Sequence, residues 1–396
     1  MRSLPGRRTK ILVFILMISL ACLSGQADLS VKPTQEKIRL HYRTDWEIEP
    51  AFKYDALCFL NVLTGDPFYL KHYEKEYNKF KPLLTKQVKG SLASLKRKIK
   101  DQAKSIISAL LCLYFSASDS ATLIDMLKAL EQSEDMQKKL TETPYYSEAG
   151  WRLFQSVKND LEVIFHFLES IQFEWYWEKF IFPKITEKVR AMRKEVLKYN
   201  IVEEVEAHLG RRLLSRRITV YVLYFSKPHA LKITGTRYLT NVDWPVEIAL
   251  RNAVHELMHP PYDIKKDREL REALSRLKKD VFLMDKVLHH NPSFGYNTFE
   301  GFVEEDCVQA LDQMTSERLG IALDPKKRWK TADDGMHVLA VALYSLMKKH
   351  KFRESGESFR NFLLRMIHSD ELSPGRIKTL NELFFKKTGY RLSVIG

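Results

Sequence analysis

The sequence predicts an α+β protein that is predominantly α-helical, and three observations lead to this fold class. Through most of residues 45–210, apolar side chains recur at three- and four-residue spacing, which is typical of amphipathic helices. At residue 217 the pattern changes to a β-branched and aromatic run, RITVYVLYF, which indicates a buried strand. Helical spacing returns at Trp244 and continues nearly to the end of the chain. We therefore expect a helical first half, a small sheet and a second helical region.

The expected helices of the first half are separated by the turn sequences TGDP, SASDS and TETPYY. The clearest of these helices are SIISALLCLYF, ATLIDMLKALEQ, WRLFQSVKNDLEVIFHFLESI and ITEKVRAMRKEVLKYNIVEEVEAHLG. After them, RITVYVLYF and ALKITGTRYLT predict two or three strands. Because the pattern shifts near residue 200, we predict a helical domain at residues 28–200 and a second domain at residues 201–396.

The composition is that of a folded protein with an export signal. Of the 396 residues, 45% are hydrophobic and 29% are charged, so a soluble body with a core is expected. Residues 1–27 combine four positive charges, the apolar run ILVFILMISLAC and a small-residue cleavage site ending at Ala27, which is typical of a signal peptide. We therefore expect a periplasmic or extracellular protein with no stable membrane insertion after cleavage. An uncleaved anchor is the alternative, and a lipoprotein site at Cys22 fits the pattern less well.

The charge and cysteine content exclude two classes of protein. Removal of residues 1–27 lowers the formal net charge from +14 to +10, and the densest basic cluster, KGSLASLKRKIKDQAK, is most simply a solvated helix face. No nucleic-acid-binding motif accompanies it, so no nucleic-acid partner is expected. Cleavage leaves the three cysteines Cys58, Cys112 and Cys307, and this odd number does not suit a disulfide scaffold.

The segment LRNAVHELMHPPYD contains the residues with the clearest chemical meaning. Its amphipathic pattern predicts a helix that two prolines end, and His255 and His259 are four residues apart on one face of that helix. Two imidazoles so placed can bind one Zn²⁺, whose bound water becomes acidic enough to lose a proton to Glu256. The alternative is an ordinary helix with two surface histidines.

The pattern His-Glu-x-x-His resembles that of the gluzincin metallopeptidases, in which a Glu on a later helix completes the zinc site. The resemblance implies a zincin-like second domain with one Zn²⁺ per chain. The helix expected at YNTFEGFVEEDCVQALDQM offers Glu300, Glu304 and Glu305. Periodicity favours Glu304 or Glu300, whereas the local resemblance favours Glu305, so we retain the adjacent pair Glu304 and Glu305 as candidate ligands. A helical hairpin, DRELREALSRLKKDVFLMDKVL, is expected between the motif and this helix.

The same resemblance implies a side chain that donates a hydrogen bond to the developing oxyanion. His337, at the start of the helix expected in TADDGMHVLAVALYSLMKKH, is the preferred candidate, and Tyr344 lies two turns later on the same face. Tyr296 is an alternative donor from a loop. Cys307 is a possible soft ligand, although a small buried thiol is the simpler interpretation.

These patterns predict an exported zinc metallopeptidase that hydrolyses peptide bonds, with a peptide or protein as substrate. His255, His259 and Glu304 or Glu305 would hold the metal, Glu256 would act as general base and His337 would stabilise the oxyanion. The resemblance further implies that substrate pairs with a strand of ALKITGTRYLT. The alternatives are a zinc hydrolase of non-peptide amides or esters and a non-catalytic helical envelope binding protein. The sequence does not predict the oligomeric state.

Overall fold

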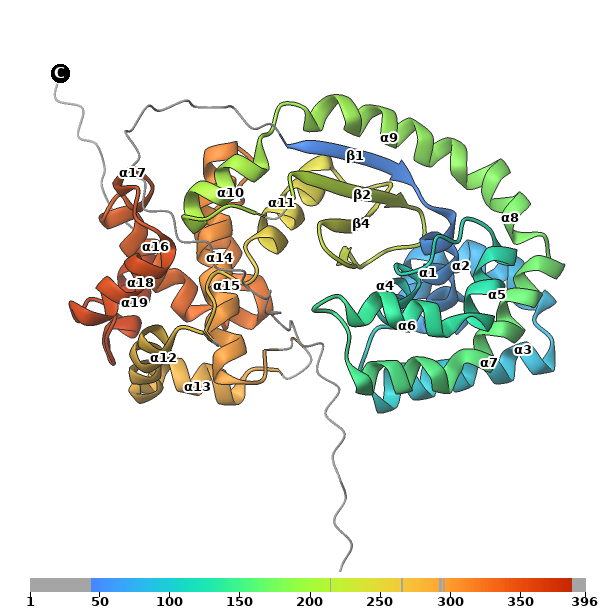
Figure 1. Ribbon diagram of the computed structural model, residues 1–396, viewed down its shortest axis with the longest axis horizontal. Coiled ribbons are helices and arrows are strands. Elements are labelled where there is room, and N and C mark those ends of the chain that lie inside the picture. Colours follow the sequence, from blue (N-terminus) through green and yellow to red (C-terminus); the bar gives the residue numbers. More distant parts are fainter. Residues whose placement is uncertain (1–43, 214, 265, 292–293, 295, 387–396) are drawn as a thin grey trace, which may run out of the picture. The chain divides into compact units, whose positions relative to one another are not determined.

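The computed structural model describes residues 44–386, except 214, 265, 292, 293 and 295, and confirms an α+β fold that is predominantly helical (Figure 1). The predicted signal peptide, with its cleavage site after Ala27, lies outside the described residues. Among the residues that are described, no helix combines the length and the apolarity needed to cross a membrane.

The described chain divides into two compact units, and the division departs from the predicted boundary near residue 200. The first unit contains residues 46–197 and 217–249, and the second contains residues 44–45, 198–216 and 250–386. The predicted strands therefore belong with the helical first half, and not with the second domain to which they were assigned from the sequence.

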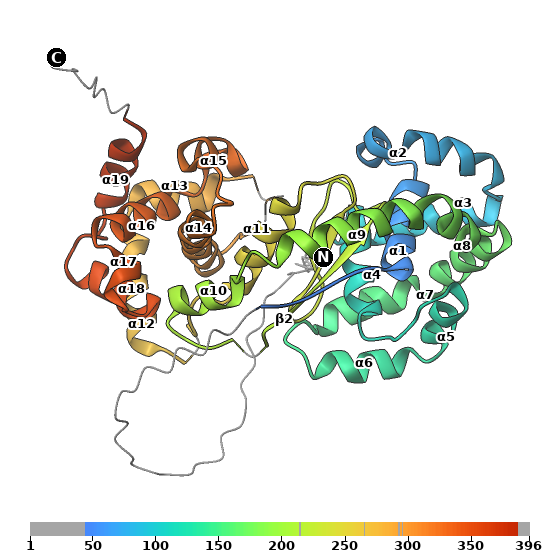
Figure 2. The ribbon, with the colours of Figure 1, turned by 90° about the horizontal axis from the view of Figure 1, so that it is seen from above.

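The first unit consists of helices around a small sheet (Figures 1 and 2). Its helices are α1 (Phe52–Leu63), α2 (Pro67–Phe80), α3 (Lys86–Leu95), α4 (Ile107–Phe115), α5 (Leu123–Glu131), α6 (Ser133–Thr141), α7 (Glu148–Ser170), α8 (Phe173–Tyr176) and α9 (Phe182–Val196). Short helical turns extend three of them, at η1 (Lys81–Leu83), η2 (Lys96–Gln102) and η3 (Trp177–Ile181). The strands are β1 (Asp45–Pro50), which begins at the last residue of a second-unit segment, β2 (Arg217–Leu223), β3 (Leu231–Lys232) and β4 (Arg237–Asn241).

The sheet has the strand order β1-β2-β4-β3, with β2 parallel to β4 and β3 antiparallel to β4. The register of the parallel pair places Val220 opposite Tyr238. Strand β1 was not predicted, because only Ile48 among its six residues is buried and so short a segment shows no clear alternation.

A buried carboxylate explains why the strands group with the first helices. Asp55 of α1 accepts hydrogen bonds from the backbone N–H groups of Tyr224 and Phe225, directly after β2, and from the indole N–H of Trp177. The rings of Phe59 and Phe225 also pack with their centroids 4.5 Å apart. These contacts join residues separated by more than 100 positions, which sequence periodicity does not reveal.

The second unit is helical and is built around one long helix. Its helices are α10 (Ile201–Leu209), α12 (Arg268–Ser275), α13 (Val281–His289), α14 (Phe299–Leu319), α15 (Pro325–Thr331), α16 (Val338–Lys349), α17 (Phe352–Ser355), α18 (Phe359–His368) and α19 (Arg376–Phe385), with short turns at η4 (Arg276–Lys279) and η6 (Ala332–Gly335). Helix α14 packs against α10, α13 and α16. Helix α11 (Val246–Leu257) has its first four residues in the first unit and the remainder in the second. The predicted hairpin corresponds to α12 and α13.

Candidate metal centre

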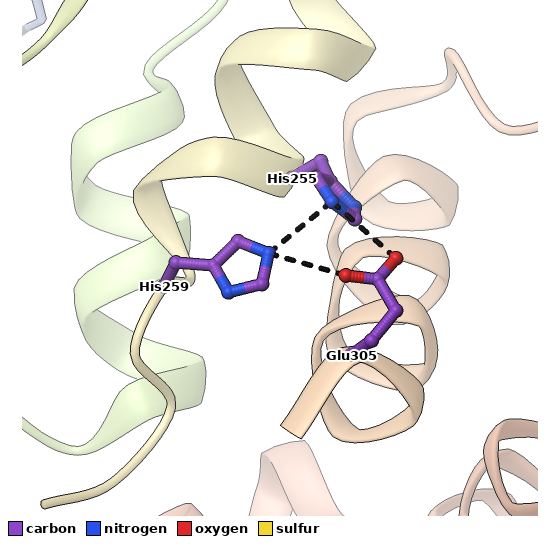
Figure 3. A group of neighbouring side chains, drawn as sticks. All are labelled: His255, His259 and Glu305. Atoms are coloured by element: carbon purple, nitrogen blue, oxygen red, sulfur yellow. Dashed lines mark hydrogen bonds and ion pairs between the residues drawn. The ribbon is translucent and has the colours of Figure 1, made fainter. Parts of the chain in front are cut away.

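The two motif histidines lie at the C-terminal end of α11. His255 is in the last turn of the helix, and His259 follows its last residue, Leu257, two positions later in the sequence. The backbone N–H groups of Met258 and His259 still bond back to the carbonyl groups of His255 and Glu256, so the helical course continues past the formal end. As a result the two Nε2 atoms are only 3.3 Å apart (Figure 3).

Glu305 reaches the same point from α14. Its Oε1 atom lies 3.6 Å from Nε2 of His255 and its Oε2 atom lies 3.4 Å from Nε2 of His259 (Figure 3). One ligand atom from each of the three residues lies within 4.8 Å of the other two. A tetrahedral Zn²⁺ with bonds of about 2.0–2.1 Å separates neighbouring ligand atoms by about 3.4 Å. The spacing of the three side chains therefore fits this metal, although it also fits a buried ion cluster.

Each histidine has a carboxylate on its other ring nitrogen. Nδ1 of His255 lies 2.8 Å from Asp312, and Nδ1 of His259 lies 3.4 Å from Glu304. When Nδ1–H donates to a carboxylate, the neutral imidazole carries its free lone pair on Nε2, the atom that faces Glu305. Glu304, one of the two predicted ligands, thus contacts the far side of His259, and Glu305 is the member of the pair that completes the three-residue group.

The cluster carries a buried oxygen that lacks a hydrogen bond. The side chains of Glu305 and His259 are each 2% exposed, whereas that of His255 is 20% exposed. Among the described residues, Oε2 of Glu305 makes no well-formed hydrogen bond, and its nearest basic partner is Nε2 of His259 at 3.4 Å. Burial of a carboxylate oxygen without a donor is costly, and a cation at this point would remove that cost.

The electrostatics of the cluster stabilise opposite charges on its members. Burial alone would raise the pKa of Glu305, but the adjacent His255 and His259 lower it well below its usual range. Burial likewise opposes a charge on His259, yet Glu304 and Glu305 raise the pKa of that imidazole to about 9. A divalent cation must therefore displace a proton from His259, which makes metal binding dependent on pH.

Arg328 of α15 supports two of the three candidate ligands through relays. Its guanidinium group donates to Asp312 at 2.9 Å, and Asp312 holds His255. The guanidinium also donates to the side-chain oxygen of Gln309, whose amide group donates to Oε1 of Glu305 at 2.8 Å. This support was not predicted from the sequence. Glu305, Gln309 and Asp312 are spaced four and three residues apart, which places them on one face of a helix. Three polar residues on one face of a largely apolar helix were the pattern from which this support could have been predicted.

Glu256 and Tyr296 also interact electrostatically with the cluster. Glu256 is half-buried and contributes to the raised pKa values of His259 and Tyr296, which places its carboxylate near both. Burial raises the pKa of Tyr296, and the nearby Glu305 raises it further. Its phenol is therefore protonated and able to donate a hydrogen bond at neutral pH.

His337 has a different position from the one its predicted role requires. Its Nδ1 atom lies 2.7 Å from Asp306 and its Nε2 atom lies 2.9 Å from Asp333. Asp306 also accepts the backbone N–H groups of Leu339 and Ala340, so this buried pair anchors the start of α16 to α14. Both ring nitrogens are already engaged, and this arrangement leaves no N–H of His337 for an oxyanion.

The remaining candidates from the sequence lie outside the three-residue group. Glu300 forms an exposed ion pair with Lys278 at 2.9 Å. The hydroxyl group of Tyr344 donates to Glu317. Cys307 is a buried free thiol, as are the other two cysteines of the described chain.

Comparisons with known protein families, with curated proteins and with solved structures find no match for this chain. The resemblance to the gluzincin metallopeptidases thus rests on the sequence motif.

Proposed function

We propose that this chain is a zinc-dependent metallopeptidase that is exported and hydrolyses peptide bonds. The observation that carries the proposal is the convergence of three ligand atoms. Two Nε2 atoms from the end of α11 and a buried carboxylate oxygen from α14 lie within 4.8 Å of one another, a spacing that suits one small cation. Each imidazole is held by a carboxylate on its far nitrogen, an arrangement that fixes metal-binding histidines in known zinc proteins.

Bound Zn²⁺ would supply a Lewis acid that lowers the pKa of water and polarises the scissile carbonyl group. Glu256, adjacent to His255 in the chain and half-buried near His259, would take the proton of the attacking water and pass it to the leaving amine. Tyr296 rather than His337 is the candidate donor to the oxyanion, because its protonated phenol lies beside Glu305 of the cluster, whereas both ring nitrogens of His337 are bound away from it.

The proposal is tested by metal analysis together with a peptide assay. We expect one zinc ion per purified chain and cleavage in a mixed peptide library that chelation abolishes. The Glu256→Gln variant should keep its zinc and lose at least about a hundredfold in activity, since only the general base is removed. Glu300→Gln, which alters an exposed glutamate on α14, is the matched control and should retain full activity.

Other outcomes favour the two alternative functions. If the chain binds zinc but cleaves only ester or non-peptide amide substrates, the zinc-hydrolase mechanism would stand and the proposed peptide substrate would be wrong. A chain that contains no zinc after purification without chelators, and whose role survives Glu256→Gln, would contradict the catalytic proposal and favour a helical envelope binding protein.

A further inference from the structure

Two cysteines of the first unit lie side by side in its core. Cys58 is in the middle of α1 and Cys112 is in α4, and these two helices pack against each other (Figures 1 and 2). The two side chains are 1% and 0% exposed, and the thiol of Cys58 forms a hydrogen bond with that of Cys112. The two sulfur atoms are therefore in contact, as free thiols in this structure.

The third cysteine of the described chain has different surroundings. Cys307 belongs to α14 of the second unit, and its thiol forms a hydrogen bond with the hydroxyl group of Tyr262. The described cysteines are thus one contacting pair and one separate thiol. Buried cysteines also occur as small apolar packing residues, but contact between two sulfur atoms from neighbouring helices is the arrangement that a disulfide requires.

We propose that Cys58 and Cys112 form a disulfide bond that joins α1 to α4. A closed bond brings two sulfur atoms to about 2.05 Å, so two thiols that are already in contact need only a small further approach. Disulfides persist in exported proteins, whereas the cytosol keeps thiols reduced. Formation of the bond in the cell therefore rests on the proposed export, but the capacity of the pair to form it does not.

The reaction requires an oxidant that is itself a disulfide, such as an oxidised dithiol protein or oxidised glutathione. One cysteine thiolate attacks a sulfur atom of the oxidant, forms a mixed disulfide and releases one thiolate. The second cysteine thiolate then attacks the cysteine sulfur of the mixed disulfide, forms the bond between Cys58 and Cys112 and releases a second thiolate. The two cysteines thus lose two protons and two electrons, and the oxidant becomes two thiols.

The buried position of the pair determines when this exchange occurs. The hydrogen bond to Cys112 and burial both raise the pKa of the Cys58 thiol, so little of its reactive thiolate is present in the folded chain. Burial also shields both sulfur atoms from an oxidant. We therefore expect the bond to form while the chain folds, before α1 and α4 close over the pair.

The test is refolding of the reduced, urea-unfolded full chain in a buffer of oxidised and reduced glutathione. Free thiols are then alkylated, and the chain is digested with trypsin without reduction and analysed by mass spectrometry. We expect a peptide that contains Cys58 to be linked to one that contains Cys112 in most chains, with Cys307 alkylated. The same buffer added to reduced chain that has already folded should form the link at least about tenfold more slowly.

Urea unfolding of the oxidised and the reduced chain measures what the bond contributes. The bond closes a loop of about 54 residues and should lower the equilibrium constant for unfolding of the first unit about 30- to 1000-fold. Cys112→Ser should abolish both the linked peptide and the difference between the two forms. Cys307→Ala, which removes the separate thiol, is the matched control and should keep both.

Three results would overturn the proposal. They are complete alkylation of Cys58 and Cys112 after refolding in the oxidising buffer, a link that includes Cys307 instead, and an oxidised first unit that is no more stable than the reduced one. The linked peptide is measured on the wild-type chain, so the test holds even if a variant does not fold. None of these outcomes bears on zinc binding or peptidase activity.

Discussion

Arg328 is connected by hydrogen bonds to two of the three candidate metal ligands. It holds Asp312 and Gln309, which in turn hold His255 and Glu305. Arg328→Met should therefore weaken zinc binding by about 10- to 100-fold, the range typical for loss of groups that orient metal ligands. Competition with a zinc-sensitive chelator dye measures this affinity without any assay of activity.

Arg318→Met is the control for this experiment. Arg318 lies in the same unit and forms an ion pair with Glu204 at 2.9 Å, but it is exposed. Its loss should leave zinc affinity within about twofold, because exposed ion pairs contribute little. If both variants bind zinc as the wild type does, the relay through Arg328 has no part in holding the ligands.

His208 should make the second unit sensitive to acid. This side chain of α10 is fully buried, its Nε2 atom has no hydrogen-bond partner among the described residues, and burial lowers its pKa to about 4. Between its ordinary pKa of 6.5 and about 4, the unfolded chain binds a proton that the folded chain does not. The free energy of unfolding therefore contains a contribution of about 3 kcal/mol that is present above pH 6.5 and lost as the pH falls towards 4.

Urea unfolding at several pH values across this window measures the effect. The His208→Gln variant should show a shallower loss of stability with acid than the wild type, whatever its stability at neutral pH. His166→Gln removes an exposed histidine and should leave the slope unchanged. An unchanged slope in His208→Gln would show that this imidazole is protonated equally in the folded and unfolded chains.

At the scale of elements, two helix ends in the second unit provide a matched pair of glycines. Gly210 ends α10 with φ of +69°, and Gly320 ends α14 with φ of +71°. A Cβ at Gly210 would lie 2.6 Å from Cβ of Ser358, whereas a Cβ at Gly320 meets nothing within 4 Å. Gly320→Ala should cost about 1 kcal/mol from backbone strain alone, and Gly210→Ala should cost about 1–3 kcal/mol more. Equal losses in urea unfolding would mean that Ser358 moves away freely.

Elements also show how far the sequence could predict this structure. The helix–strand–helix succession and the motif helix were predicted, because their periodicity is local. The sequence did not decide which of Glu300, Glu304 and Glu305 joins the two histidines. Helix α14 is buried on nearly all sides, so its apolar residues do not identify a single buried face. The role assigned to His337 could not be checked from sequence, since its partner Asp306 lies 31 positions away.

At the scale of the whole chain, the predicted domains differ from the observed units because long-range contacts decide them. Asp55 joins α1 to residues that follow β2, so the sheet belongs to the helices that precede it. Helix α11 then carries the chain from one unit into the other. All three residues of the candidate metal centre nevertheless lie in the second unit.

Because all three candidate ligands lie in the second unit, we expect zinc to stabilise that unit and not the first. At a free zinc concentration a hundredfold above its dissociation constant, the second unit should gain about 2.7 kcal/mol against unfolding. Five of the six tryptophans lie in the first unit, and Trp329 lies in the second. In a Trp329→Phe variant, tryptophan fluorescence therefore follows the first unit, while circular dichroism follows the helices of both.

Zinc should raise the temperature of one circular-dichroism transition and leave the fluorescence transition of this variant unchanged. Adding Glu305→Gln should abolish the shift, because it removes the charge of the third candidate ligand. A zinc-dependent shift in fluorescence would mean that the two units unfold as one body. A shift that survives Glu305→Gln would show that zinc binds without this carboxylate, and Glu305 would then not be the third ligand beside His255 and His259.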